Sequence, residues 1–379
     1  MSYKIPFNKP FIVGQELYYI AQAVLNGRIA GDAVFTHRCQ KLMEDTFGAK
    51  KILLTHSCTA ALEMAAILSG VAEGDEVILP SFTFVSTANA FYLRGARLKF
   101  IDIRPDNLNL DETALADAVT PRTKVVVPVH YAGIGCEMDT ILDLARKHGF
   151  LVIEDAAQGV NATYKGKYLG TLGDFGTYSF HETKNYICGE GGALIINNDE
   201  YVERAEIIRE KGTNRSQFFR GEVDKYSWVD IGSSFLPSDM LAAFLYAQLE
   251  NMDKINKRRA DIYDFYLQAL QPLADEGRMT LPSGHPDCVG NNHLFYIILE
   301  DERTRDALMG HLKSHDILAV FHYLPLHLSP VGRKMGGEPG SLPVTESIAG
   351  RLLRLPFYYA LTREEQEEVV GRIGEFFAT

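Results

Sequence analysis

Short apolar runs alternate with amphipathic segments between residues 51 and 154, and this alternation restricts the chain to a few folds. The runs are almost continuously apolar, which indicates strands buried on both faces of a sheet. Strands of this kind joined by helices form mostly parallel sheets, which bind ligands beyond the carboxyl ends of their strands. We expect strands at residues 51–54, 76–79, 97–101, 124–130 and 150–154, and helices at residues 60–69, 85–94 and 138–148.

The flanking segments predict a second, smaller unit. An amphipathic helix is expected at residues 15–25, and a long helix from residue 237 to about residue 270 would lead out of the sheet domain. A chain of 379 residues exceeds the roughly 100–200 residues that are usual for one domain. We therefore predict an α/β fold with a large domain at residues 1–250 and a small C-terminal α+β domain at residues 251–379. Within the small domain, strands are expected at residues 294–299 and 317–321, and helices at residues 304–315 and 364–377.

The charge of the chain excludes some partners. Its formal net charge is −11 and its pI is near 5.5, so no net basic field would attract nucleic acid or an anionic membrane. The N-terminus carries Pro6 and Pro10 and lacks the apolar core of a signal peptide. No apolar run approaches the roughly 20 residues of a membrane span. A cytoplasmic protein is therefore expected.

The cysteines give no sign of a cross-linked or metal-bound scaffold. They are five in number, widely spaced and without a CxxC pair, so neither a disulfide framework nor a zinc or iron–sulfur cluster is indicated. Reduced and mostly buried thiols are expected, and no metal ion is expected in the chemistry.

The stretch from residue 150 to residue 196 places an acid and a lysine after two predicted strands. Asp155 ends the apolar run that begins at Phe150, and Lys184 follows an aromatic strand expected at residues 177–180. A buried carboxylate is costly unless a cation such as a protonated pyridine ring meets it. A partly buried lysine near other cations has a lowered pKa and can form an imine. Taken singly, Asp155 is better explained as a capping or salt-bridged acid, and Lys184 as a solvated surface charge.

Two further segments follow the carboxyl ends of predicted strands, where parallel sheets bind their ligands. Residues 55–60 lie between a strand and a helix, so their hydroxyls and N–H groups gather at a helix N-terminus, which binds anions. An ordinary helix cap by Ser57 or Thr59 explains the same residues. Phe84 has the flat face that stacking on a ring requires, although a single aromatic residue is commonly part of a core. With Asp155 and Lys184, these residues predict a site with phosphate, ring and imine ends.

The motifs around these residues resemble the pyridoxal-phosphate (PLP) sugar aminotransferases of the DegT/StrS type. The resemblance covers nearly the whole chain and implies the aspartate-aminotransferase (type I) fold of PLP-dependent transferases. Residues 211–220 (KGTNRSQFFR) are most similar to family members that make dTDP-4-amino-4,6-dideoxygalactose in bacterial glycan synthesis. The other motifs are residues 80–90 (PSFTFVSTANA), 128–133 (PVHYAG), 154–158 (EDAAQ), 179–185 (SFHETKN), 189–192 (GEGG) and 322–327 (HYLPLH).

The resemblance implies a role for each residue of a cofactor site. Lys184 would form the imine with pyridoxal 5'-phosphate, and Asp155 would pair with the pyridine nitrogen. Gln158 would hydrogen-bond the ring hydroxyl, and Phe84 would stack on the ring. The phosphate would be held by Thr59, by the backbone of Ala60 and by Ser179.

It also implies a nucleotide-sugar pocket and a homodimer with active sites at the subunit interface. The family pattern Gly-x-Asn-x-Arg reads here as residues 232–236 (GSSFL), so Ser234 stands where an Asn reaches the phosphate of the neighbouring subunit's cofactor in much of the family. The residues expected to contact the substrate are Lys211, Arg215, His322, Tyr323 and His327.

The implied reaction moves an amino group from L-glutamate to C4 of a dTDP-4-keto-6-deoxyhexose and gives dTDP-4-amino-4,6-dideoxygalactose. Three other functions remain: a PLP-dependent nucleotide-sugar dehydratase, a non-catalytic regulatory or binding protein on this fold, and a nicotinamide-dependent enzyme. Family dehydratases replace the lysine by histidine, so Lys184 favours transfer. The acidic charge disfavours DNA binding, and no predicted strand is followed by GxGxxG.

Overall fold

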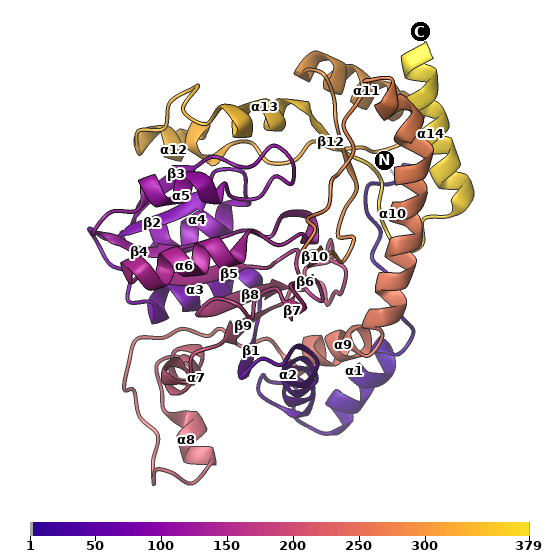
Figure 1. The fold of residues 1–379 in the computed structure, drawn as a ribbon. Helices are drawn as coiled ribbons and strands as arrows, with labels where there is room; N and C mark the ends of the chain where they lie inside the picture. Colours follow the sequence, from indigo (N-terminus) through magenta and orange to yellow (C-terminus); the bar gives the residue numbers. More distant parts are fainter. Residues whose placement is uncertain (1–2, 379) are drawn as a thin grey trace.

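The computed structural model describes residues 3–378 and is built around a seven-stranded sheet (Figure 1). The strand order is β1-β9-β8-β5-β4-β2-β3, and every neighbouring pair is parallel except the two pairs that involve β9. The predicted mostly parallel sheet is therefore confirmed. Its strands are β1 (Lys51–Thr55), β2 (Glu76–Pro80), β3 (Arg97–Ile101), β4 (Thr123–Val126), β5 (Leu151–Asp155), β8 (Phe175–Ser179) and β9 (Gly192–Ile196).

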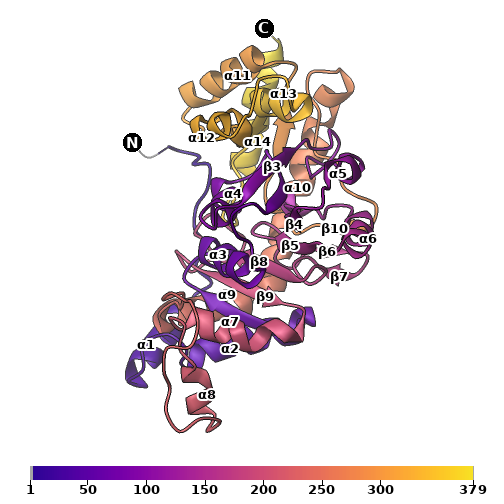
Figure 2. The same ribbon diagram turned by 90° about the vertical axis from the view of Figure 1, so that its left-hand side faces the viewer.

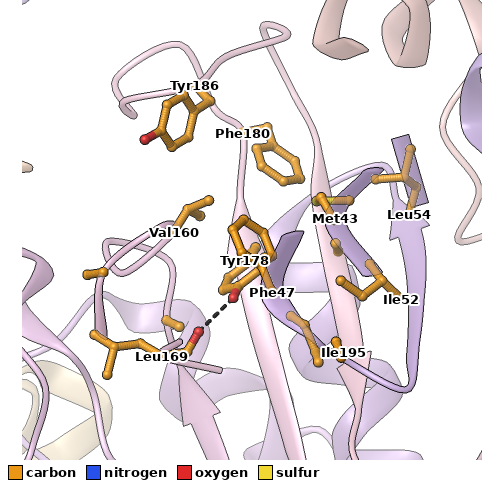
Figure 3. Packing of buried hydrophobic residues seen from close by; sticks show 14 of the residues in the cluster. Met43, Phe47, Ile52, Leu54, Val160, Leu169, Tyr178, Phe180, Tyr186 and Ile195 are labelled. Carbon is orange, nitrogen blue, oxygen red and sulfur yellow. Dashed lines mark hydrogen bonds between the residues drawn. The ribbon is translucent and has the colours of Figure 1, made fainter. Parts of the chain in front are cut away.

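Helices pack on both faces of this sheet because its strands carry apolar residues on both sides. One buried cluster joins the sheet to α2 (Val34–Phe47), α6 (Met138–His148) and α9 (Asp239–Leu249), with α1 (Glu16–Leu25) against α9. A second cluster joins it to α3 (Cys58–Leu68), α4 (Val85–Tyr92) and α7 (Val202–Arg209). Figure 3 shows the first cluster, where Phe47 lies edge-on to Tyr178 with 5.6 Å between ring centroids. The Tyr178 hydroxyl donates to the Leu169 carbonyl (2.6 Å).

The C-terminal part forms its own buried cluster, which also takes in Ile5 from the N-terminal segment. The long helix α10 (Met252–Asp275) runs from the sheet domain to this cluster, and α14 (Arg363–Ala378) packs against it (Figures 1 and 2). The boundary at residue 250 stays a prediction. The cluster further involves α11 (Glu302–Ser314), β11 (Tyr296–Ile298) and β12 (Leu352–Arg354).

The remaining elements are short. They are α5 (Glu112–Ala118), α8 (Arg215–Phe219), α12 (Pro330–Lys334), α13 (Pro343–Arg351), the small sheet of β10 (Cys288–Val289), β6 (Thr163–Tyr164) and β7 (Lys167–Tyr168), and the 3₁₀ turns η1 (Tyr131–Gly133), η2 (Asp199–Tyr201) and η3 (Leu326–Leu328).

Two predicted elements were wrong. The single helix at residues 237–270 is two helices, because Asn251 leaves the helical conformation and its side chain donates to the Ala247 carbonyl (2.9 Å). Asparagine competes with the helix backbone in this way. Residues 317–321 form no continuous strand, since Ile317 pairs with Ile5 and Val320 pairs with Arg354 in isolated bridges. Within residues 3–378, no helix is long and apolar enough to cross a membrane.

Candidate active site

A pocket of about 450 Å³ lies at the carboxyl ends of the parallel strands, where ligands bind in sheets of this kind. Its walls come from the segments that follow β1, β2, β5 and β8, together with parts of the C-terminal cluster. Eight of the residues that the sequence singled out line this one pocket: Thr59, Phe84, Asp155, Gln158, Ser179, Lys184, His322 and Tyr323.

Asp155 is the buried anion of the pocket. It is the last residue of β5, and only 5% of its surface is exposed. One carboxylate oxygen accepts from the Thr87 hydroxyl (2.6 Å) and the other from the Ala157 N–H (3.1 Å). Because Thr87 gives its proton to Asp155, the hydroxyl of Thr83 donates to Thr87 (2.8 Å). Two donors leave room for a cation beside this carboxylate.

The layer behind Asp155 fixes its position. Glu154 and His130 are fully buried, and the His130 Nε2 donates to the Glu154 carboxylate (2.8 Å). His130 Nδ1 accepts from the Cys136 N–H (3.1 Å), which assigns the proton of the neutral ring to Nε2. The backbone N–H groups of Gly170, Leu172 and Gly173 also donate to the Glu154 carboxylate. Glu154, the residue directly before Asp155 in β5, is therefore held in place by hydrogen bonds to both of its carboxylate oxygens.

Lys184 is the half-buried amine of the pocket. It lies in the loop between β8 and β9, which is closed by backbone bonds from Phe180 to Gly191 (2.8 Å) and from Glu182 to Gly189 (3.0 Å). Burial lowers the pKa of Lys184, although the charge of Asp155 opposes this shift. Among residues 3–378, Lys184 Nζ has no hydrogen-bond or ion-pair partner. The amine is thus free to react.

The lowered pKa of Lys184 predicts a pH-dependent stability in the cofactor-free protein. Burial in the folded protein lowers the pKa of Lys184, so the unfolded chain binds more protons than the folded one. The destabilisation caused by the buried charge therefore decreases as the pH rises toward about 10.4, the ordinary pKa of lysine. Lys184→Met is therefore expected to raise the free energy of unfolding at about pH 7 and to lose this advantage by about pH 10. Urea unfolding of both cofactor-free proteins at the two pH values measures the gain in the free energy of unfolding on substitution. An equal gain at both pH values would contradict the prediction.

Several hydroxyl groups line the pocket near the starts of α3 and α4. Ser57 caps α3 by accepting from the Ala60 N–H (3.1 Å), so the ordinary cap predicted for this segment is present. Thr59 Oγ1 and Ser86 Oγ lie 2.8 Å apart, and Ser179 lines the same pocket. A Cβ on Gly192 would lie 2.4 Å from the Cys58 nitrogen, so glycine is required for β9 to approach the start of α3.

A side-chain network forms another part of the pocket wall. Gln158 accepts from the Ala132 N–H (2.8 Å) and donates to the Tyr323 hydroxyl (3.0 Å). The ring of Tyr323 stacks on His322 with 3.6 Å between centroids, and His322 Nδ1 lies 2.8 Å from the Tyr131 hydroxyl. Tyr323 has a φ of 36°, a strained value for a non-glycine residue that is commonest at functional sites. Burial lowers the pKa of His322, so its ring is neutral.

Five predicted residues do not line the pocket of the single chain. Ala60 is buried beneath it. His327 is buried between the Ser81 hydroxyl (2.7 Å) and Glu346 (3.1 Å). Lys211 and Arg215 pair with Glu210 in the segment that carries α8, which projects from the body at the bottom of Figure 2. The fifth is Ser234, which is exposed.

The pocket residues that were not predicted include Thr87, His293 and Arg354. Thr87 stands four residues after Thr83 on the first turn of α4, a spacing that the sequence displays. His293 Nδ1 lies 2.9 Å from the side-chain oxygen Oδ1 of Asn185, and Asn185 directly follows Lys184. Arg354 is the last residue of β12 and is brought to the pocket by the tertiary fold, so no local sequence pattern predicts its place there.

The sheet, the C-terminal cluster and the pocket at the strand ends define the type I fold of PLP-dependent transferases, as predicted. The sequence profile of the DegT/DnrJ/EryC1/StrS aminotransferase family matches residues 14–374, and the chain belongs to this family.

Similar proteins span nearly the full chain. The pleiotropic regulatory protein of Geobacillus stearothermophilus is 36% identical, over 84% of this chain and 82% of its own. GDP-perosamine synthase of Caulobacter vibrioides is 32% identical over 98% of both chains. The crystal structure of the aminotransferase TlmJ from Streptoalloteichus hindustanus has a TM-score of 0.90 at 30% identity and 99% coverage of both chains.

Family membership confirms the predicted cofactor, pyridoxal phosphate, and makes the protein a PLP-dependent sugar aminotransferase. The pocket fits this cofactor. A nearly buried carboxylate with two donors suits a pyridinium nitrogen, and an unpartnered amine of lowered pKa suits a carbonyl carbon. Hydroxyls at the starts of α3 and α4 suit a phosphate. Phe84, with 58% of its surface exposed, is a pocket residue rather than a core residue.

Proposed function

We propose that the protein transfers the amino group of L-glutamate to C4 of a dTDP-4-keto-6-deoxyhexose and forms dTDP-4-amino-4,6-dideoxygalactose. The observation that carries amino transfer is the presence of half-buried Lys184, with its lowered pKa, and buried Asp155 in one pocket. The name of one relative, GDP-perosamine synthase, supports a nucleotide-linked sugar. The similarity of residues 211–220 to enzymes that make this amino sugar supports the particular product.

In this proposal each residue acts at a defined atom. Bound pyridoxal phosphate supplies an electron sink for the carbon that loses or gains a proton. Lys184 Nζ would hold the cofactor, and the released amine would move a proton from the glutamate Cα to the cofactor carbon and, with the keto sugar, from the cofactor carbon to sugar C4. Asp155 keeps the ring nitrogen protonated. Gln158, fixed by Ala132 and Tyr323, retains one N–H for the ring hydroxyl.

The phosphate would bind at the start of α3. Thr59 and Ser179 offer hydroxyl donors, and the unpaired N–H groups at the start of the helix would add further donors to the anion. The Ala60 N–H is already bonded to the Ser57 hydroxyl, so the phosphate would compete with this cap. Phe84 supplies the apolar surface on which the ring would lie.

Arg354 is our candidate for the carboxylate of glutamate. Its Nη2 donates to the Phe321 carbonyl (3.1 Å), its guanidinium lies 4.6 Å from the centre of the Phe7 ring, and its Nε is buried without a partner. The donor carboxylate is attached to the carbon that bears the reacting nitrogen, so it must bind close to Lys184. Arg354 fits because its charge contributes to the lowered pKa of Lys184, after burial.

Arg354→Met is therefore expected to raise the KM for glutamate about 10- to 100-fold, the worth of a charged hydrogen bond. The half-reaction with the keto sugar should keep its KM. Stopped-flow measurements of the two half-reactions separate these effects. The control is Arg351→Met, because Arg351 donates to Leu299 and Ser347 and does not line the pocket. Equal losses in both half-reactions would contradict the assignment.

We also propose that the active enzyme is a homodimer in which Lys211, Arg215 and Ser234 serve the partner's pocket. Large apolar side chains are exposed on α1 and on the segment with α8, as expected of an interface: Leu17 (78%), Leu25 (85%), Phe219 (66%) and Trp228 (81%). The projecting segment that carries Lys211 and Arg215 does not reach its own pocket.

Complementation tests this arrangement. Lys184→Ala and Arg215→Glu homodimers are each expected to be nearly inactive. Mixed after dissociation, half of the dimers would be hybrids with one intact site, which restores about a quarter of all sites. Turnover of the mixture, compared with that of the separate proteins, measures this. A mixture as inactive as its components, with hybrids shown by mass spectrometry, would place Arg215 outside the partner's site.

A spectroscopic titration tests the enzymatic function against the alternative of a regulatory protein, which the name of one relative raises. The purified holoprotein should be yellow, and glutamate should bleach this colour while one equivalent of 2-oxoglutarate is formed. Subsequent keto sugar should restore it. A colour that glutamate leaves unchanged would contradict amino transfer and favour a binding protein.

A further inference from the structure

Three potential metal ligands lie where α11 contacts α14, in the C-terminal part of the chain (Figure 1). His311 belongs to α11, and His315 follows four residues later as its C-terminal cap, so both lie on one face. Glu375 comes from α14. One nitrogen from each histidine and one carboxylate oxygen lie within 4.8 Å of one another. Zn–N and Zn–O bonds of about 2.0–2.2 Å place tetrahedral ligand atoms about 3.3–3.6 Å apart, so small side-chain rotations would bring these three atoms onto one ion.

The hydrogen bonds of His315 direct a lone pair outward. Its Nδ1 donates to the carbonyl oxygen of His311 (2.9 Å), because a carbonyl only accepts. In the neutral ring this leaves Nε2 unprotonated and able to bind a cation. A backbone carbonyl that accepts from the second ring nitrogen is the usual support of a metal-bound histidine.

His311 contributes an unsatisfied atom. Its Nε2 is buried and has no hydrogen-bond partner, and such atoms are uncommon in folded proteins. The two imidazole rings lie 4.6 Å apart between centroids at 52° to each other, so they do not stack face to face. Glu375 accepts twice from Arg372 Nη1 (3.0 and 2.8 Å), so an incoming cation would share this carboxylate with Arg372.

We propose that His311, His315 and Glu375 bind a divalent transition-metal ion of the Zn²⁺ class, with water in the remaining coordination positions. Two imidazoles and one carboxylate favour Zn²⁺, Ni²⁺ or Cu²⁺ over Mg²⁺ and Ca²⁺, which prefer all-oxygen sites. None of the three residues lines the cofactor pocket, so the ion takes no part in amino transfer. It would tie α14 to α11 and thereby stabilise the C-terminal cluster.

Calorimetric titration of chelator-treated holoenzyme with ZnCl₂ tests the site. One ion per chain is expected, with binding unaffected by excess Mg²⁺. His311→Ala/His315→Ala should weaken binding at least about 10-fold, since loss of a ligand costs more than loss of its support. Glu375→Gln, which keeps the shape of the side chain, should also weaken it. The control is His148→Ala, because His148 is an exposed histidine at the end of α6.

Thermal unfolding gives an independent readout. Zn²⁺ should raise the Tm of the wild type and of His148→Ala, and it should not raise that of the double variant. Since His311 packs against Phe376 (5.7 Å between centroids), His315→Gln serves as a second variant that leaves this contact in place. Absence of Zn²⁺ binding to the wild type, or equal affinity in the wild type and all the variants, would overturn the proposal.

Discussion

Replacement of Lys184 by alanine is expected to reduce turnover by about 10⁴-fold or more, because the variant lacks both the amine that holds the cofactor and the group that moves the proton. The visible absorption of covalently held cofactor should disappear as well. The amine has no partner among the described residues, so the pocket loses no hydrogen bond on its removal. Steady-state turnover and the absorption spectrum of the reconstituted protein measure the two effects.

Two further variants make this result specific. Lys184→Arg keeps a positive charge but cannot act as a neutral amine, so it should be as inactive as Lys184→Ala. Lys167→Ala removes an exposed lysine of β7 and should retain full activity. Substantial turnover by Lys184→Arg would rule out the proposed proton transfer through Lys184.

The second large effect is expected for Asp155→Asn. The amide oxygen should still accept from the Ala157 N–H, and the amide nitrogen should donate to the Thr87 hydroxyl. The cofactor should therefore still bind. The ring nitrogen would lose its anionic partner, and the proton shift should slow by about 10²- to 10³-fold, the usual cost of removing one oriented charge partner. Single-turnover absorbance changes with glutamate measure this step. An unchanged rate would refute the role of Asp155.

Local sequence patterns predicted most of the sheet and one side of the pocket. Apolar runs located the strands, and residues at or just beyond their ends, such as Asp155, Phe84 and Thr59, line the pocket. This succeeded because parallel strands bring their carboxyl ends to one edge, so sequence position alone determines the place. Lys184 followed from the same rule together with the family resemblance.

The features that local patterns missed have separate physical causes. Arg354 lies far from Lys184 in sequence and enters the pocket because β12 pairs with β11 in the C-terminal cluster. The helix break at Asn251 depends on a side-chain bond to Ala247 that competes with a nearly apolar helical pattern. Lys211 and Arg215 lie outside the pocket of their own chain, and their proposed role requires a second chain.

Incubation of the holoenzyme with dTDP-4-keto-6-deoxyglucose and ¹⁵N-labelled L-glutamate, followed by mass spectrometry and NMR of the product, tests the proposed amino transfer. We expect the label to be bonded to C4 of a dTDP-linked 4,6-dideoxy sugar of galacto configuration. A sugar product that lacks ¹⁵N, or one that has lost water instead of gaining nitrogen, would contradict it.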